Sequence, residues 1–402
     1  MRPMENPERR RTLFLTYLYP SFFGTGAQIR SAALVRMLAA REDVHLLVIQ
    51  PRENNPAVRD AELDNLCKKI EFIPLTPAGE PGGLAPEKPQ LIGPIRRFYE
   101  ENQLNSLFVF RIESCFFLTG GVLNTFPRRY LDLDELASRR IKMLDHLKSI
   151  SGATTTEPAD RRLQMVIRMM EKDFIPRFQK TFVSSEVEAA EARRLTGFEH
   201  VHVLPNIYPR RQLLPPSPAS TPREILFVGT FSHFPNVDAV LYFHRAILPL
   251  IRRRLGEEVV FRVVGSPRPE SIGELAQDPA VQLMGYQKDL EPHYARASLA
   301  VAPLRAGAGT RIKILEAFSY GRPVVSTSIS AAGLDVVDGE NILLADAPED
   351  FALACVKILE SPGLAARLVA NGRRLHEEHY SAGTLLRLYD DAMADNVLNS
   401  NP

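Results

Sequence analysis

Runs of hydrophobic residues alternate with amphipathic segments along most of the chain. The first run extends from Thr12 to Pro20, and an amphipathic segment from about Ile29 to Leu38 follows it. Further apolar runs in the first half are VHLLVIQ, KIEFIPL, SLFVFRI, RRYLDLDE, KTFVSS and VHVLPN. Short continuous apolar runs are typical of strands that are buried on both faces, and helical segments between them favour parallel βαβ units.

A Pro-rich segment interrupts this alternation, and a second series of strands begins after it. The expected strands of this series are ILFVG, FRVVG, VQLMGY, LAVAPL, RPVVSTS and NILLA. Between the first two, a helical pattern runs from Phe234 to Arg254, and Pro249 should kink this helix. We therefore predict an α/β protein with two doubly wound domains. The predicted parts are residues 1–206, a linker at 207–222, residues 223–380, and a C-terminal helix at 381–402.

Composition places the chain among ordinary globular proteins. It has 402 residues, of which 45% are hydrophobic and 24% charged, and its formal net charge is +1. This balance gives no reason to expect a nucleic-acid partner. The cysteines Cys67, Cys115 and Cys355 are far apart in the sequence and are expected to be reduced thiols. Reduced thiols favour a cytoplasmic protein. No apolar run reaches the ~18 residues that a spanning helix needs.

The segment from Ala308 to Val325, AGTRIKILEAFSYGRPVV, has the pattern of a phosphate site. A glycine-rich turn follows an apolar strand and precedes a short helix. Small residues let a ligand approach the backbone, and the start of a helix directs N–H groups and a positive dipole end at an anion. Arg311 and Lys313 add positive charge, and Glu316 is placed to accept hydrogen bonds from ribose hydroxyls. The ordinary alternative is a strand–helix turn with no ligand.

The order of several motifs resembles a known family. They are ILFVGTFSHFPNVDAV, FRVVG, VQLMGYQKDLEPHYARASLAVAPL, GAGTRIKILEAFSYGRPVVSTSISAAGL and DGENILLA. In this order they resemble the nucleotide-sugar domain of retaining glycosyltransferases of family 4. FFGTGAQIR, TFVSSEVEAAEARR and HVLPNIYP in the first half match the family more loosely. The resemblance implies the GT-B fold, in which two Rossmann-like domains face each other across a cleft and the last helix crosses back to the first domain.

The resemblance also implies an activity. A sugar would pass from a nucleotide-diphosphate donor to a hydroxyl of a glycan, a lipid-linked or a small-molecule acceptor, with retention of configuration and without a metal or other cofactor. The implied donor-binding residues are Gly24, Gly26, Thr230, His233, Gly265, Gly309, Thr310, Arg311, Ile312, Lys313 and Glu316.

The chain departs from the family in three respects. Ala308 stands where the family has a first glutamate, Thr230-Phe231 stands where it has an arginine, and the lysine that the family has a few residues later is not obvious. We hypothesise that Arg311 and Lys313 supply the missing positive charge, and we count both as catalytic. Asn236 is expected to cap a helix, and Asn206 could be a turn residue.

Asp132 and Asp134 are the catalytic candidates of the first half. Strand alternation places them on the same face, at a strand end that faces the acceptor in the family. The alternatives are a helix cap or a surface carboxylate. The sequence Asp-Leu-Asp also fits a metal-binding motif of another glycosyltransferase fold, but two oxygen ligands are a weak signal and we expect no metal. Arg111 and Glu113 face the acceptor or form buried pairs.

Two questions stay open at this stage. Residues 160–180 combine basic and apolar residues, so this helix is either solvated, which we favour, or touches the inner face of an anionic membrane. The activity has two alternatives: a sugar-nucleotide epimerase of the same fold, and a non-catalytic nucleotide-sugar-binding subunit.

Overall fold

A computed structural model describes residues 9–51, 54, 56, 59–75, 89–118, 121–152, 158–209, 211–215, 223–266 and 270–394. These residues form two compact units. Unit 1 contains the described residues of 1–139, 156–204 and 388–402, and unit 2 contains those of 140–155 and 205–387. Residues 1–8, most of a second Pro-rich run at 74–94 and part of the predicted linker lie outside the described residues.

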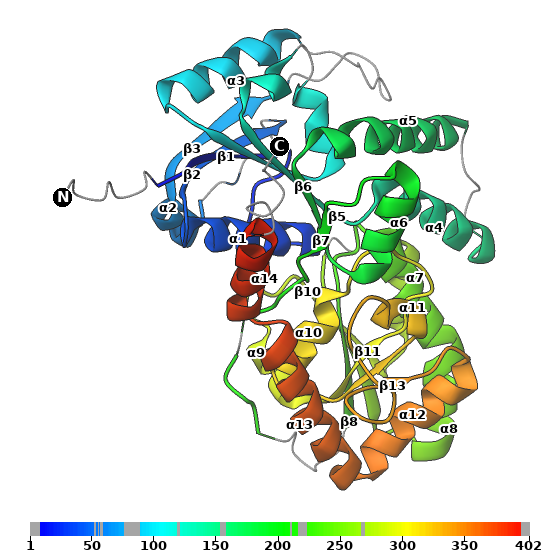
Figure 1. Ribbon diagram of the computed structural model, residues 1–402. Coiled ribbons are helices and arrows are strands. Elements are labelled where there is room, and N and C mark those ends of the chain that lie inside the picture. Colours follow the sequence, from blue (N-terminus) through cyan, green and yellow to red (C-terminus); the bar gives the residue numbers. More distant parts are fainter. Residues whose placement is uncertain are drawn as a thin grey trace, which may run out of the picture. The chain divides into compact units, whose positions relative to one another are not determined.

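Unit 1 is built on a parallel seven-stranded sheet with the order β3-β2-β1-β4-β5-β6-β7. Helices flank its strands on both sides (Figure 1). The expected apolar runs form these strands, and Phe14, Phe108 and Phe182 stack on one another in the core with ring centres 5.6 and 5.9 Å apart. The strands are β1 (Arg11–Thr16), β2 (Asp43–Gln50), β3 (Cys67–Pro74), β4 (Ser106–Phe110), β5 (Arg128–Asp134), β6 (Lys180–Val183) and β7 (Val201–Val203).

The helices of this part of the chain occupy the segments between the strands. The α3 helix begins at Pro89, so the end of the Pro-rich run is helical and not part of a loop. The helices are α1 (Gly26–Ala39), α2 (Ala61–Leu66), α3 (Pro89–Glu101), α4 (Ala137–Ile150), α5 (Pro158–Phe174) and α6 (Glu186–Thr196), with 3-10 helices at Ile112–Leu118, Val122–Thr125 and Ile175–Arg177.

Unit 2 has a parallel six-stranded sheet with the order β10-β9-β8-β11-β12-β13. Its helices also lie on both sides of the strands (Figure 1). The fold class predicted from the sequence is confirmed. The strands are β8 (Arg223–Val228), β9 (Val259–Val264), β10 (Val281–Gly285), β11 (Ala297–Ala302), β12 (Val324–Ser326) and β13 (Leu343–Leu344). The helices are α7 (Phe234–Tyr242), α8 (Leu248–Leu255), the 3-10 helix Glu270–Gln277, α9 (Glu291–Arg296), α10 (Ile312–Ser319), α11 (Ser328–Ala331), α12 (Pro348–Glu360), α13 (Pro362–His379) and α14 (Ala382–Ala394).

Pro249 interrupts the long helix after β8, as expected, and it does so through a π-helical turn. This turn, Phe243–Ile247, joins α7 to α8. The amide of Leu248 donates to the carbonyl of Phe243, five residues earlier. A proline has no N–H, and its ring collides with the carbonyl four residues before it, so the chain widens by one residue.

The last helix of the chain is divided between the units. Residues from Leu388 onward belong to unit 1, where Tyr389 is 2% exposed. The Tyr389 hydroxyl donates to the carboxylate of Glu42 at 3.0 Å, and Arg41 forms an ion pair with Asp390 at 2.7 Å. These contacts attach the end of α14 to the β1–β2 side of the first sheet.

Candidate functional site

The loops after β8 and β11 lie where the strand order of the second sheet reverses. β8 pairs with β9 on one side and with β11 on the other. In open parallel sheets, ligands bind beside the carboxyl ends of the strands at such a point. The predicted donor-binding residues of unit 2 come from these two loops, from the end of β9 and from the start of α10.

The turn between β11 and α10 requires glycine at Gly307. Its φ is +144°, and a Cβ at this position would lie 1.8 Å from a guanidinium nitrogen of Arg311. Gly309 also has a positive φ, 71°. The Arg311 side chain folds back over the turn and donates a hydrogen bond to the carbonyl of Ala308. The glycine-rich turn expected from the sequence is therefore present, and Arg311 lies against it.

Helix α10 begins immediately after this turn. Arg311 is the residue before the helix, with extended backbone angles, and Ile312 is the first helical residue. The first N–H groups of a helix and its positive dipole end face the preceding turn. Thr310 is buried, and its hydroxyl accepts a 2.8 Å hydrogen bond from the side-chain amide of Asn206. Asn206 is thus more than a turn residue, because it fastens this loop.

Lys313 lies in the first turn of α10 and is half-buried. Its ammonium donates to Oδ1 of Asn236 at 2.8 Å and lies 3.9 Å from the centre of the Phe227 ring. Burial and, to a smaller extent, the nearby Arg311 lower the pKa of Lys313 to about 7, while Glu316 acts in the opposite direction. An anion bound at this turn would favour the charged form of the lysine.

Glu316 lies one turn further along α10 and is 6% exposed. One of its carboxylate oxygens accepts a 2.7 Å hydrogen bond from the hydroxyl of Tyr294 on α9. Burial raises the pKa of Glu316 to about 7, although hydrogen bonds from Tyr294 and Tyr208 lower it. The carboxylate is therefore held by tyrosine hydroxyls inside unit 2.

The chain segment before β8 is attached to this cluster. The backbone carbonyl of Tyr208 lies 3.0 Å from Nε2 of His376 on α13. The guanidinium of Arg211 lies 5.8 Å from the Tyr208 ring centre and 6.0 Å from that of Tyr320. Tyr208 and Arg211, which the sequence assigned to the linker, thus lie in the surroundings of Glu316.

The other predicted residues of unit 2 occupy the ends of β8 and β9. Gly265 has a φ of +154°, and a Cβ there would lie 1.8 Å from the carbonyl oxygen of Gly229, so these strand ends approach closely. Thr230 is half-buried and follows β8. His233 is exposed and precedes α7. Asn236 lies inside α7, so the expectation that it caps this helix is wrong.

In unit 1, the predicted glycines lie in the loop between β1 and α1. Gly26 is the first residue of α1, and Gly24 lies two residues before it. The side chain of Gln28 closes this loop, accepting from the N–H of Thr25 at 3.0 Å and donating to the carbonyl of Tyr19 at 3.1 Å. A Cβ at Gly24 would lie 2.5 Å from the Gln28 side chain. This packing accounts for Gly24 without a ligand, and donor binding by Gly24 and Gly26 stays a prediction.

The two aspartates of unit 1 belong to a buried network of arginines and carboxylates. Asp132 has no exposed surface, and both its oxygens accept from Arg30 at 2.9 and 2.7 Å. Asp134 is 6% exposed, receives a 2.6 Å hydrogen bond from Arg111, and lies 3.6 Å from Arg30. The register of β5 shifts between the two aspartates, and Asp134 has a φ of +61°.

This network places Asp132 and Asp134 side by side, as the sequence suggested, but through a bulge and not through simple alternation. Burial raises the pKa of Asp132, and Arg30 opposes this effect. The contacts of Asp132 favour a positioning role. Neither aspartate is a helix cap or a surface carboxylate. The catalytic role of both stays a prediction.

Comparisons with known proteins agree with this arrangement. Residues 222–361 match the family model of glycosyl transferases group 1. This segment contains the turn before α10, Lys313 and Glu316. An exopolysaccharide phosphotransferase of Streptomyces coelicolor is 27% identical over 121 residues, which is 29% of this chain and only 13% of that protein.

The similarity to solved structures extends over nearly the whole chain. The sucrose-phosphate synthase of Thermosynechococcus elongatus has a TM-score of 0.72 at 17% identity and covers 98% of this chain and 100% of its own. A glycosyltransferase of Rickettsia africae has a TM-score of 0.67 at 12% identity, covering 98% and 100%. Anabaena HepE, solved with UDP and glucose, has a TM-score of 0.66 at 14% identity, covering 96% and 100%. The chain has the GT-B fold, and the family match supports glycosyltransferase function.

Several residues of these clusters were missed by sequence reasoning. Asn236 was interpreted as a helix cap, and Tyr294 and Arg30 were read only as parts of motifs. The sequence did contain a signal for Arg30, because an arginine surrounded by apolar residues on a helix is expected to have a buried polar partner. The partners of Asn236 and Tyr294 come from distant segments of the chain, and no local pattern reveals them.

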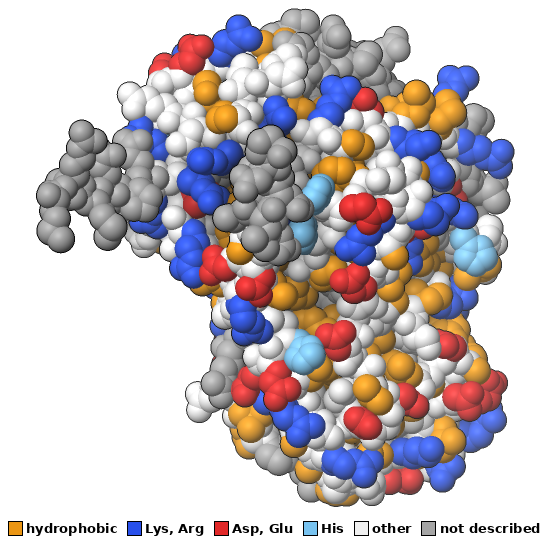
Figure 2. Space-filling view, viewed as in Figure 1, with side chains coloured by type: hydrophobic (Ala, Val, Ile, Leu, Met, Phe, Trp, Pro, Cys, Tyr) orange, Lys and Arg blue, Asp and Glu red, His pale blue; other side chains and the backbone are white. Residues whose placement is uncertain are grey.

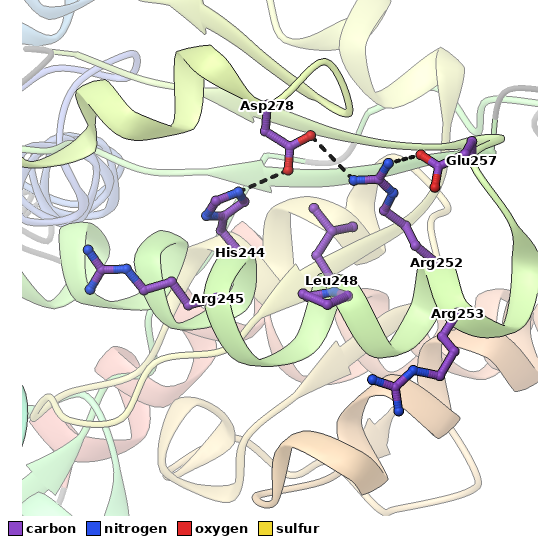
Figure 3. Close-up of a pocket in the computed structure, with 8 residues that line it drawn as sticks. His244, Arg245, Leu248, Arg252, Arg253, Glu257 and Asp278 are labelled. Atoms are coloured by element: carbon purple, nitrogen blue, oxygen red, sulfur yellow. Dashed lines mark hydrogen bonds and ion pairs between the residues drawn. The ribbon is translucent and has the colours of Figure 1, made fainter.

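One further pocket of unit 2 lies away from these strand ends. It has a volume of about 570 Å³ and is lined by residues of the π-helical turn, of α8 and of the chain around Asp278 (Figure 3). His244 contacts Asp278 at 3.0 Å, and Arg252 is paired with Asp278 and Glu257. Arg245, Arg252 and Arg253 outnumber Glu257 and Asp278 in the lining, so the pocket carries an excess of positive charge.

Two kinds of feature are absent from the described residues. Within the described ranges, no group of three or more His, Cys, Asp or Glu side chains is arranged to hold a metal ion. In the same part of the chain, no helix combines the length and the apolar character needed to cross a bilayer.

Proposed function

We propose that this protein transfers a sugar, with retention of configuration and without a metal ion or other cofactor, from a nucleotide-diphosphate sugar to a hydroxyl acceptor. The observation that carries the proposal is the glycine turn before α10, which is followed by Lys313 and Glu316 on that helix. This turn lies where the strand order of the second sheet reverses, and it belongs to the segment that matches a glycosyltransferase family. The acceptor belongs to glycan, polysaccharide or glycolipid synthesis. The predicted cleft between the two domains stays a prediction.

Sugar transfer requires the site to stabilise a leaving diphosphate. The bond between the anomeric carbon and the diphosphate oxygen breaks, and its electron pair leaves with that oxygen. The acceptor oxygen forms the new bond to the same carbon and passes its proton to the leaving diphosphate oxygen. Donors aimed at the developing charge stabilise this transition state, and loss of one typically costs about 3 kcal/mol. We assign this work to the N–H groups at the start of α10, to Lys313 and to Arg311, and the ribose hydroxyls to Glu316.

A thermal-shift screen with UDP-, GDP- and dTDP-linked sugars tests donor binding first. The donor found in this way is then used for transfer assays with Lys313→Ala and Arg311→Ala. We expect each variant to lose roughly a hundredfold in kcat/KM. Arg254→Ala is the matched control. Arg254 is exposed near the end of α8, which leads to the amino end of β9, whereas the proposed site lies at the carboxyl ends of the strands. Near-native rates in both site variants would reject the assignment.

The finer parts of the proposal have separate tests. NMR of the product distinguishes retention from inversion at the anomeric carbon. Full activity after extensive chelation is expected, and activity that depends on added Mg²⁺ or Mn²⁺ would contradict metal independence. Incubation with the donor alone tests the epimerase alternative, in which the sugar changes configuration without an acceptor. Calorimetric binding without turnover across a panel of acceptors would favour a non-catalytic subunit.

A peripheral membrane contact through α5 is a further part of the proposal. Met165 and Met169 are 61% and 62% exposed on this helix. The exposed side chains around them include those of Arg161, Arg162, Arg168 and Lys172, and Lys and Arg side chains gather over α5 among hydrophobic ones (Figure 2). Such a surface suits anionic lipid headgroups. Sedimentation with anionic liposomes and none with zwitterionic ones is the expected result, and its absence would leave α5 a solvated helix.

A further inference from the structure

Asn236 joins the two loops that flank the strand-order reversal of unit 2. Its side-chain Nδ2 donates a 2.8 Å hydrogen bond to the carbonyl of Thr230, in the loop after β8. Its Oδ1 accepts a 2.8 Å hydrogen bond from the ammonium of Lys313, in the first turn of α10. One amide group therefore connects the loop after β8 to the first turn of α10, although Asn236 itself lies on α7.

The surroundings leave this amide a single orientation. Asn236 is 7% exposed. A lysine ammonium can only donate and a carbonyl can only accept, so the amide oxygen must face Lys313 and the amide nitrogen must face Thr230. The turn packs directly on the amide, because a Cβ at Gly229 would lie 2.9 Å from Cγ of Asn236. A shift of either loop would break one of the two hydrogen bonds.

A neutral acceptor suits Lys313 if its ammonium serves a bound anion. The charged groups that affect Lys313 are Arg311 before α10 and Glu316 one turn later, while Phe227 on β8 and Asn236 on α7 are uncharged. An asparagine orients the ammonium and leaves its charge available. A carboxylate in the same place would neutralise that charge and repel a phosphate.

We propose that Asn236 is a positioning residue, which holds the ammonium of Lys313 and the Gly229–Thr230 turn in the arrangement that binds the donor diphosphate. This inference rests on the proposed function. It adds that the lysine acts in a position set by a residue that does not itself touch the donor. It also adds that the uncharged amide at this position is required.

The test compares Asn236→Asp and Asn236→Ala with the unchanged protein, with UDP, GDP and dTDP as probes in calorimetry between pH 6 and 9. Free Lys313 is half-neutral near pH 7, whereas a bound diphosphate keeps it charged. Binding should therefore take up a proton at pH 8, measured as a dependence of the heat on the buffer. Affinity of the unchanged protein should fall as the pH rises above 7.

Asn236→Asp should weaken binding at least tenfold at pH 6.5 and shift the loss of affinity to higher pH, because the carboxylate keeps Lys313 charged in the free protein. It should also reduce the proton uptake at pH 8. Asn236→Ala should weaken binding about tenfold, because the ammonium is no longer held in place. In a Lys313→Met background, both substitutions should have little further effect on affinity.

Asn341→Asp is the matched control. Asn341 is 8% exposed, and its Oδ1 accepts from the amide of Val337 at 2.9 Å, in the loop before β13. This variant should leave the pH dependence and the proton uptake unchanged. A thermal melt of every variant identifies those that do not fold.

The outcomes separate the two proposals. If the unchanged protein binds none of the three diphosphates, the proposed function and this inference both fail. If it binds one of them, and Asn236→Asp has the same affinity, pH dependence and proton uptake, only the positioning role is overturned. The same holds if Asn341→Asp reproduces the shift, or if the Asn236 variants lose as much affinity in the Lys313→Met background.

Discussion

The hydroxyl of Tyr294 on α9 donates a 2.7 Å hydrogen bond to the carboxylate of Glu316 on α10, in the interior of unit 2. The Tyr294 ring also stacks on that of Tyr320, with centres 4.5 Å apart. Helix α9 thereby holds the Glu316 carboxylate, to which we assign the ribose hydroxyls of the donor. The bond is intramolecular and buried, so its removal has consequences for stability as well as for binding.

Tyr294→Phe should destabilise the protein and weaken donor binding. The substitution keeps the ring but removes a donor from a buried carboxylate, which typically costs about 1–3 kcal/mol. We expect the free energy of unfolding in urea to fall by this amount at pH 8, and donor KM to rise with it. Tyr286→Phe is the control, because Tyr286 is 62% exposed. Equal stability of the two variants would show that the hydroxyl of Tyr294 contributes nothing.

Glu316 and Lys313 should give the protein an unusual dependence of stability on pH. The pKa of each is about 7 in the folded chain, against ordinary values of 4.5 for the glutamate and 10.5 for the lysine. Between pH 4.5 and 7 the folded chain keeps a proton on Glu316 that the unfolded chain has released, so stability falls as the pH rises. Between pH 7 and 10.5 the unfolded chain keeps a proton on Lys313 that the folded chain has released, so stability rises.

These two groups therefore contribute a minimum of stability near pH 7. Glu316→Gln removes the fall in stability between pH 4.5 and 7. We therefore expect this variant to be more stable than the unchanged protein by about 2–3 kcal/mol above pH 7 and equally stable below pH 4. Urea unfolding from pH 4 to 9 measures the difference. Glu291→Gln, at an exposed position of α9, should show none. A constant difference for Glu316→Gln across this range would contradict the buried titration.

Gly307→Ala should damage the site through local geometry alone. The φ of +144° at Gly307 is one that residues with a Cβ rarely adopt, and a methyl group there would also displace the Arg311 guanidinium, which lies 1.8 Å from the Cβ position. We expect donor affinity to fall at least tenfold, measured by calorimetry. Gly273→Ala adds the same methyl group where no atom lies within 4 Å, and it should bind normally. Normal binding by both variants would place the donor elsewhere.

Asp132→Asn separates a positioning role from a catalytic one. Breaking a buried ion pair usually costs roughly 3–5 kcal/mol. Asp134, 3.6 Å from Arg30, compensates part of the charge that Asp132→Asn leaves behind. If Asp132 mainly holds Arg30, the variant should unfold at a lower temperature. The double variant Arg30→Met, Asp132→Leu should then recover most of the stability, together with transfer activity. Unchanged stability with a large loss of kcat would instead identify Asp132 as catalytic.

The sequence alone determined the succession of strands and helices in both units. Buried parallel strands need continuous apolar residues, and each predicted run forms a strand of one of the two sheets. It also located the glycine turn at Gly307–Gly309, because positive φ angles demand glycine locally. Pro249 likewise predicted a distortion of the helix after β8, because the missing N–H is a property of the proline itself.

Only the tertiary structure decided which side chains meet. Asn236 and Lys313 are 77 positions apart, and Arg30 and Asp132 are 102 positions apart. Sheet topology brings such residues together, and hydrogen-bond geometry then selects their roles. Glu316 shows the same division: its helix could be read from the sequence, but its pKa of about 7 depends on burial and on hydroxyls contributed by other segments. Local patterns specify backbone conformation, whereas burial and long-range contacts set the chemistry of each side chain.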